Sequence, residues 1–429
     1  MNKTNRLALV MSLGLAMTGC GGGDDGGASS NNKGSNPKPT NNGEKALPIM
    51  PILPEQPSIA NNRNPQPDSA LTSRDEALPP KPLLPPLPDK DLGPNVIPIE
   101  VSSAILERER KIADSINDQL SNKRSSCGMG RLSVDNNLNG VARNHIRYMK
   151  HVDTLANRIA ANSHIEEVIN GSESITGKSN PFYSGRTADE RVFASDYKNK
   201  AYGATENIAR VYYAENFKDA STIGNYLLAS LLAGPYHMRS LLNDGLVDTG
   251  AAFSIYTPAR AKNSTAYSLV INSGKSDLVK RSPYAQWGLL TYPCNGTGLV
   301  SQALFNESPN PFGTTRDLEK NPVGQPVYVR LDMDNPTKTP LQISNVVYKD
   351  VDRNISIPVQ TITAENDVNK ILDINESIII PLTDNQKSCP DGKNNCGLLP
   401  YTQYEVSFDY EFYGEFINKV IRFNTGSYY

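Results

Sequence analysis

The chain has 429 residues, which is enough for two or three domains at about 100–200 residues each. Its net charge of −2 and the lack of any basic stripe along the sequence exclude a nucleic-acid-binding protein of the usual basic kind. The 31 glycines and 31 prolines are unevenly placed, and their distribution indicates how the chain is divided.

Residues 1–19 have the organisation of an export signal. Lys3 and Arg6 are followed by an apolar run, Leu7 to Met17, that is shorter than the roughly 20 residues needed to span a bilayer. The run ends in Thr18-Gly19-Cys20, which resembles the lipobox of bacterial lipoproteins; an ordinary secretory signal with an unrelated cysteine is the alternative. We therefore expect a lipid on Cys20 to anchor the protein to a membrane of the cell envelope. Glycines rather than aspartate follow Cys20, which by resemblance to Gram-negative sorting rules favours the outer membrane.

Residues 20–100 are predicted to form a disordered tether. Of the 31 prolines, 16 lie between residues 21 and 100, where there are almost no aromatic residues. Such a composition favours extended polyproline II conformations, which act as a semi-rigid spacer. A ligand for an aromatic groove is the alternative interpretation of the same prolines.

Residues 101–278 are predicted to form an α/β/α layered domain. A helix from Ser103 to Leu120 is indicated by four apolar residues on one face, and a second helix is expected to begin at an N-cap, Ser133. Those four residues are Ile105, Ile112, Ile116 and Leu120. Further along, the patterns predict a helix from Thr187 to about Tyr197, a short helix or strand from Glu206, a helix from Ser221 to Leu232, and strands Asp248 to Tyr256 and Tyr267 to Ile271.

Residues 283–429 are predicted to form an all-β sandwich of immunoglobulin-like type. Between Tyr404 and Phe412, aromatic and apolar residues alternate strictly with polar ones, which is typical of a half-buried strand. The other expected strands are 327–331, 343–348, 355–362, 378–382 and 417–423. The fold class predicted for the whole chain is therefore α+β, with the two folded domains in series.

Export makes the four cysteines after Cys20 candidates for disulfides. Cys389 and Cys396 bracket a turn-rich loop that a local disulfide would close, and Cys127 would then pair with Cys294. Four cysteines allow three connectivities, and the other two stay open on the sequence alone.

A series of short motifs in the first domain resembles one family. The motifs are Leu132 to Leu138, Ala142 to His145, Ser163-His164, Glu206 to Ala209, Pro235 to Arg239 and Gly250 to Ala252. In this order they resemble the CAP superfamily (cysteine-rich secretory proteins, antigen 5 and pathogenesis-related 1) in its bacterial SCP-like form. The resemblance covers about 170 residues and implies an α/β/α sandwich.

The resemblance also implies a cleft in which His164, Glu206 and His237 lie together. In some family members this cleft binds a divalent metal through two histidines and two acidic residues. The second carboxylate, expected from a Trp-x-x-Glu helix, has no match here, because Tyr226-Leu227-Leu228-Ala229 stands in its place.

Three interpretations of these residues remain open. His164 and His237 with Glu206 suit a zinc or other divalent site with a free position for water. Without metal, Glu206 beside two imidazoles would serve as a catalytic general base. The third interpretation is a hydrogen-bonded polar cluster that ties loops to the sheet. His145 is expected to be a satisfied histidine of the core, and His151 a surface residue just after a helix end.

Two functions follow from these features. The first is an envelope-anchored binding or interaction protein whose ligand is a lipid, a glycan or another protein. The alternative is a metal-assisted hydrolase, a peptidase or other enzyme that acts on an extracellular polymer.

Overall fold

The computed structural model describes residues 103–156, 164–213, 219–276, 288–332, 340–384, 396–412 and 414–426. The predicted signal peptide, Cys20, the predicted tether and Cys389 lie outside these ranges. Within the described ranges, no helix is both long and apolar enough to cross a membrane.

The first folded region is built on a four-stranded sheet with strand order β1-β3-β4-β2. The β1–β3 pair is parallel, and the other two pairs are antiparallel. The strands are β1 (Ser133–Val134), β2 (Ala204–Tyr213), β3 (Leu246–Tyr256) and β4 (Thr265–Lys275). The run that begins near Glu206 is therefore a strand, one of the two forms that the sequence left open.

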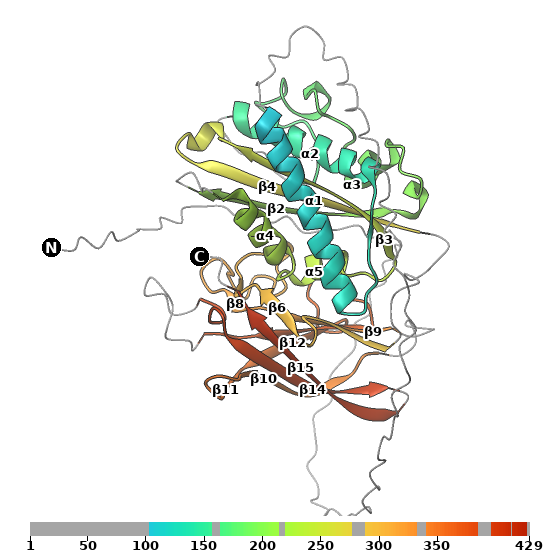
Figure 1. The fold of residues 1–429 in the computed structure, drawn as a ribbon, viewed down its shortest axis with the longest axis vertical. Helices are drawn as coiled ribbons and strands as arrows, with labels where there is room; N and C mark the ends of the chain where they lie inside the picture. Colours follow the sequence, from blue (N-terminus) through green and yellow to red (C-terminus); the bar gives the residue numbers. More distant parts are fainter. Residues whose placement is uncertain are drawn as a thin grey trace, which may run out of the picture. The chain divides into compact units, whose positions relative to one another are not determined.

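Helices cover both faces of this sheet (Figure 1). On one face, Ile146 packs with Ile208 and Val270 of the sheet. On the other face, Ile116 and Leu227 belong to the same core as the alternate residues of β2 and β4. This arrangement confirms the predicted α/β/α layers. The helices are α1 (Ser103–Ser126), α2 (Asn136–Leu155), α3 (Ala188–Phe193), α4 (Ala220–Leu231) and α5 (Pro235–Leu241).

Several predictions about the ends and faces of these helices differ from the structure. Ser133 is not the N-cap of α2, because it pairs with β3 in strand β1. Asp135 is the cap, since its carboxylate accepts from the backbone N–H groups of two residues in the first turn. Ile105 is 41% exposed, because the buried positions of α1 begin only at Glu109. Helix α3 starts at the predicted cap, Thr187, but ends four residues early, at Phe193.

The second region is a sandwich of a five-stranded and a four-stranded sheet. The strand orders are β11-β10-β14-β15-β6 and β12-β13-β9-β5, and a small β7–β8 pair lies beside them. Their inner faces share a core in which Val329 and Ile379 of one sheet meet Tyr348, Tyr404 and Phe423 of the other. The strands are β5 (Gly288–Tyr292), β6 (Thr297–Val300), β7 (Ala303–Leu304), β8 (Val323–Gly324), β9 (Val327–Asp332), β10 (Ile343–Asp350), β11 (Ile355–Ile357), β12 (Val359–Thr363), β13 (Glu376–Pro381), β14 (Gln403–Phe412) and β15 (Glu415–Thr425).

The strand predicted over 355–362 is divided into β11 and β12, which belong to different sheets. Pro358 separates them, and proline cannot donate a hydrogen bond to a strand ladder. The short strands β5 to β8 were not predicted from the sequence, because runs of two to five residues carry little periodic signal.

The two folded regions share one apolar core. Tyr328 and Ile378, on the outer face of the four-stranded sheet, belong to the same cluster as Met238 and Leu241 of α5. A disulfide between Cys127 and Cys294 also joins the end of α1 to the segment after β5, which confirms that predicted pairing. Cys396 is disulfide-bonded as well, but its predicted partner, Cys389, lies outside the described residues.

Candidate functional site

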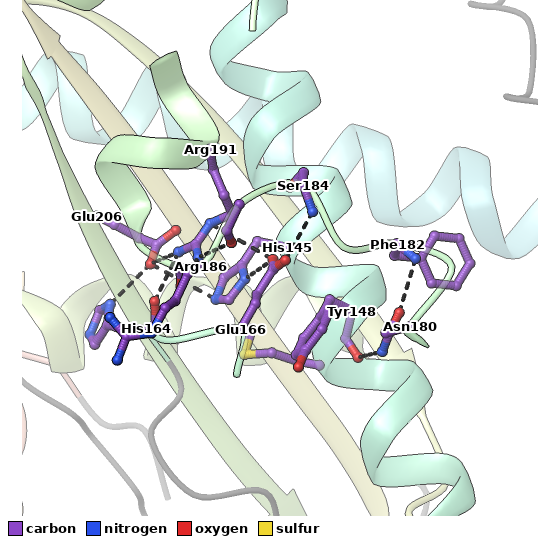
Figure 2. Close-up of polar contacts among 12 residues, drawn as sticks. His145, Tyr148, His164, Glu166, Asn180, Phe182, Ser184, Arg186, Arg191 and Glu206 are labelled. Carbon is purple, nitrogen blue, oxygen red and sulfur yellow. Dashed lines mark hydrogen bonds and ion pairs between the residues drawn. The ribbon is translucent and has the colours of Figure 1, made fainter. Parts of the chain in front are cut away.

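Glu206 is the centre of a buried polar cluster between β2 and α2. Side chains alternate across a strand, so Glu206 shares the α2 face with Ile208, while Asn207 points to the other face. The Oε1 atom of Glu206 accepts from Nη2 of Arg191 at 2.6 Å and from Nδ1 of His164 at 3.0 Å (Figure 2). Glu206 is only 2% exposed, so these partners replace the water that its charge would otherwise require.

Arg191 projects from α3 into the same cluster and is 1% exposed. Besides Glu206, its guanidinium donates to the backbone carbonyls of His164, Gly185 and Arg186 at 3.2–3.4 Å. A planar guanidinium with several donors is suited to hold a carboxylate and neighbouring carbonyls at once. Arg191 therefore fixes the loop that carries His164 to the sheet that carries Glu206.

A second carboxylate reaches the cluster through His145 of α2. Nδ1 of His145 donates to Oε1 of Glu166 at 2.8 Å, because a carboxylate can only accept. The opposite ring nitrogen, Nε2, lies 3.8 Å from Oε1 of Glu206 (Figure 2). The backbone N–H of Ser184 donates to the other oxygen of Glu166 at 3.0 Å. His145 is fully buried and hydrogen-bonded as expected, but it also belongs to the Glu206 cluster.

The electrostatics of the cluster stabilise the ionised form of Glu206. Burial alone would raise the pKa of this carboxyl, but the electrostatic effects of His145 and Arg191, and the hydrogen bond from His164, outweigh it. The pKa of Glu206 consequently lies well below its usual value. Glu206 therefore stays ionised at neutral pH, and the guanidinium of Arg191 holds its negative charge in place.

The lowered pKa of Glu206 predicts that the folded protein loses stability at acid pH. A carboxyl whose pKa falls on folding stabilises the fold above its unfolded pKa, near 4.5, and loses that contribution as pH falls toward the folded value. Glu206→Gln is therefore expected to be less stable than the wild type by about 3–5 kcal/mol at pH 7, because it leaves Arg191 buried without its anion. Urea titrations should show that this difference in the free energy of unfolding narrows steadily below pH 4.5. Glu365→Gln, at an exposed position, should be as stable as the wild type at every pH. A difference for Glu206→Gln that does not change with pH would contradict the prediction.

His237 takes part in a separate histidine–carboxylate pair. It lies in α5 and is fully buried, and its Nδ1 donates to Oε2 of Glu307 at 3.0 Å. The other oxygen of Glu307 accepts from the backbone N–H groups of Tyr236 and His237 at 3.0 and 3.3 Å. Gly234, the N-cap residue, has no side chain to offer, so Glu307 caps the helix from a distant part of the sequence.

The structure thus joins His164 to Glu206 and gives His237 a different carboxylate. Helix α5 contacts the other face of β2, where Asn207 donates to Ser240 at 3.0 Å. Oε2 of Glu206 and Nε2 of His237 are both buried without a hydrogen-bond partner. The second carboxylate that the family resemblance implied is absent from α4, and Glu307 supplies one to His237 instead.

His151 differs from its expected surface position. It lies inside α2, which continues to Leu155, and it packs edge-on against Phe182 with ring centroids 5.9 Å apart. Its side chain is half-buried, and this burial lowers the pKa of the ring. The expectation failed because α2 continues past His151 and ends only at Leu155.

The expected divalent metal does not fit the cluster as it stands. A zinc ion would lie about 2.0–2.2 Å from its oxygen and nitrogen ligands. Nη2 of Arg191 occupies that side of Glu206 at 2.6 Å and brings a permanent positive charge. Within the described ranges, no group of three or more His, Cys, Asp or Glu side chains is arranged to hold a metal ion.

The layer order and the buried histidine–carboxylate pair together define a class, the α/β/α sandwich with a polar cluster at the edge strand of its sheet. Residues 118–270 match the model of the cysteine-rich secretory protein family, known as CAP, and this part of the chain is a CAP domain. The match ends within β4, so the β sandwich and Glu307 lie outside it. A comparison with curated proteins finds no match to the chain.

Proposed function

We propose that the protein is an extracytoplasmic binding protein that a lipid on Cys20 holds at the cell envelope. A CAP domain supports a role in binding or interaction outside the cytoplasm. The signal-like leader, the Thr18-Gly19-Cys20 step and the proline-rich tether support display of this domain at a membrane.

The observation that carries a binding role is the closure of the polar cluster. A general base must come within about 2.6–3.2 Å of the proton that it removes. Glu206 is 2% exposed, and the oxygen that its partners contact is held by Arg191 and His164. Of the two expected histidines, only His164 has a partly exposed side chain, at 14%. The cluster is therefore built to fix structure and to present one imidazole edge, which suits recognition better than turnover.

An open groove between α1 and α4 offers a second contact surface for a ligand. Its volume is about 450 Å³, within the usual range of roughly 300–1,000 Å³ for ligand sites. Ile112 and Ala104 contribute apolar surface, and Arg108 and Lys111 contribute positive charge, which Glu107 partly offsets at 3.6 Å from Lys111. This combination suits an amphipathic ligand with an acidic group, such as an anionic lipid.

Charge reversal in the groove tests this ligand class. Lys111→Glu is expected to weaken binding of the full-length protein to anionic lipid micelles several-fold, because the side chain is 70% exposed and lines the groove. Lys198→Glu makes the same charge change at another exposed lysine and should bind like the wild type. Equal losses in both variants would indicate attraction by overall charge and would contradict a ligand site in the groove.

The anchor is tested separately in cells. Cys20→Ser is expected to move the protein from the membrane fraction to the soluble fraction, because serine in place of Cys20 cannot carry the proposed lipid. Fractionation followed by immunoblotting measures the distribution, and Cys389→Ser controls for loss of a cysteine. Retention of Cys20→Ser in the membrane fraction would contradict the proposed anchor.

A metal-assisted hydrolase is the second candidate. It needs His164 and His237 on one ion, with Glu206 as ligand or base. The unpartnered Nε2 of His237 favours it, since a buried nitrogen without a partner calls for an explanation. The position of Arg191 weighs against it, and so does the pairing of His164 and His237 with different carboxylates. Release of products from cell-wall or protein substrates, abolished by Glu206→Ala but not by His151→Ala, would establish turnover in place of simple binding.

A further inference from the structure

We propose that the open edge of strand β15 binds the same edge of a second copy of this chain, so that the two five-stranded sheets join across a two-fold axis. The contact lies in the β sandwich, outside the CAP match. It depends neither on the Glu206 cluster nor on the lipid anchor.

Strand β15 is paired along its length on one side only. On that side it runs antiparallel to β14 from Glu415 to Asn424 (Figure 1). On the other side, β6 pairs with it only near its end, at Phe423 and Thr425. Among the described residues, no strand pairs with the earlier part of β15 on this second side. An open strand edge of this kind is a template for pairing with another chain.

The backbone groups on the open edge belong to alternate residues. The N–H and C=O groups of Arg422 both form hydrogen bonds to the segment that leads into β6, so they point away from β14. Because these directions alternate along a strand, the backbone groups of Phe416, Asn418 and Val420 point the same way. All three residues are exposed, so a second strand can reach their N–H and C=O groups.

Exposed apolar side chains accompany this edge. Phe416 is 67% exposed, Val420 is 44% exposed and Ile417 is 37% exposed. Proteins that remain monomeric usually protect an open edge with charges, proline or a covering element. The charged residues before Arg422 in β15 are Glu415 and Lys419, and their opposite signs suit self-pairing better than protection.

Charge selects the register in which two copies pair. With Ile417 on the two-fold axis, antiparallel pairing places Glu415 of each copy opposite Lys419 of the other. Within its own hairpin, neither residue faces an opposite charge, because their partners in β14 are Phe412 and Phe408. Opposite charges directly across two strands stabilise the pairing, and this register forms two such pairs.

The same register fits the length of the open edge. It places Gly414 of one copy opposite Val420 of the other, just before the part of β15 that β6 covers. A register with Asn418 on the axis would instead place Gly414 opposite Arg422, whose backbone groups are already hydrogen-bonded. A two-fold contact of this kind is closed, because each copy uses the edge that the other needs.

Disulfide trapping on the purified full-length protein in detergent tests the proposal. Residue 417 would face its counterpart in a non-hydrogen-bonded pair, where Cα atoms lie about 4.5 Å apart and a disulfide can form. Ile417→Cys is therefore expected to give a dimer on non-reducing gels after mild oxidation. The wild type and Val347→Cys should remain monomeric, although Val347 is 43% exposed on the neighbouring part of the sheet.

Charge changes in the Ile417→Cys background test the register. Lys419→Glu or Glu415→Lys alone should lower the dimer yield several-fold, because each places like charges opposite one another. A mixture of the two variants should recover the yield, since the positive edge of one then faces the negative edge of the other. A chain that carries both changes should recover it as well. Recovery also shows that the substituted hairpins are folded.

Four results would overturn the proposal. Equal dimer yields from Ile417→Cys and Val347→Cys would indicate random collisions. A higher yield from Asn418→Cys than from Ile417→Cys would place a different residue on the axis. An undiminished yield in Lys419→Glu, or no recovery in the mixture, would show that these charges do not hold the two edges together.

Discussion

Glu307→Ala is expected to destabilise the protein by about 3–5 kcal/mol, although Glu307 lies outside the CAP match. The carboxylate accepts from Nδ1 of His237 and from the backbone N–H groups of Tyr236 and His237. Alanine leaves three buried donors without an acceptor, and each such donor costs about 1–3 kcal/mol. Urea denaturation followed by circular dichroism measures the change.

Glu319→Ala is the matched control for this prediction. Glu319 lies twelve residues further along the same segment but is exposed, so its loss should change stability by less than about 0.5 kcal/mol. Equal effects of the two substitutions would show that Glu307 does not cap α5 in solution. A specific loss at Glu307 would show that the chain after the CAP match completes the surroundings of His237.

Gly234→Ala is expected to destabilise the protein by a comparable amount, for a steric reason. A Cβ atom at Gly234 would lie 1.8 Å from Oε2 of Glu307 and 3.0 Å from Nδ1 of His237. Atoms cannot approach that closely, so Glu307 would have to leave His237. The backbone of Gly234 has φ −76°, which any residue adopts, so the effect comes from the clash and not from backbone strain.

A double-mutant cycle separates this clash from a general intolerance of side chains at Gly234. In the Glu307→Ala background the obstructing carboxylate is gone, so Gly234→Ala should cost much less than in the wild type. Additive effects of the two substitutions would contradict the proposed close contact. Gly140→Ala in α2, where an added Cβ meets nothing within 4 Å, should be neutral or stabilising.

The predictions for Glu307 and Gly234 concern the surroundings of His237, which the sequence patterns predicted least well. His164 and Glu206 were recognised from short motifs, and the structure joins them. Arg191 was visible only as one charged residue of the helix predicted from Thr187 to about Tyr197, and Glu166 fell in none of the predicted elements. Nothing in the sequence near Glu307 distinguishes it from exposed carboxylates, because its partner lies 70 residues away.

Secondary structure was predicted best where a periodic pattern was long. Helix α2 repeats its apolar spacing from Leu138 to Met149, and strand β14 alternates from Tyr404 to Phe412; both were located from these patterns. Strand β1 has two residues, and its pairing with β3 moved the helix cap from Ser133 to Asp135. Pairing with a distant strand is a tertiary contact, and local propensity contains no information about it.

The amino-acid sequence by itself predicted the layers of the fold and favoured the Cys127–Cys294 pairing, and the family resemblance of its short motifs implied that His164 and Glu206 lie together. Periodicity, cysteine placement and short motifs can all be recognised without knowing which distant segments pack together. Only the tertiary structure decided that His237 pairs with Glu307 and that Arg191 neutralises Glu206. A buried charge is stabilised by whichever opposite charge or donor the fold brings within hydrogen-bond distance, and that choice depends on how distant segments pack.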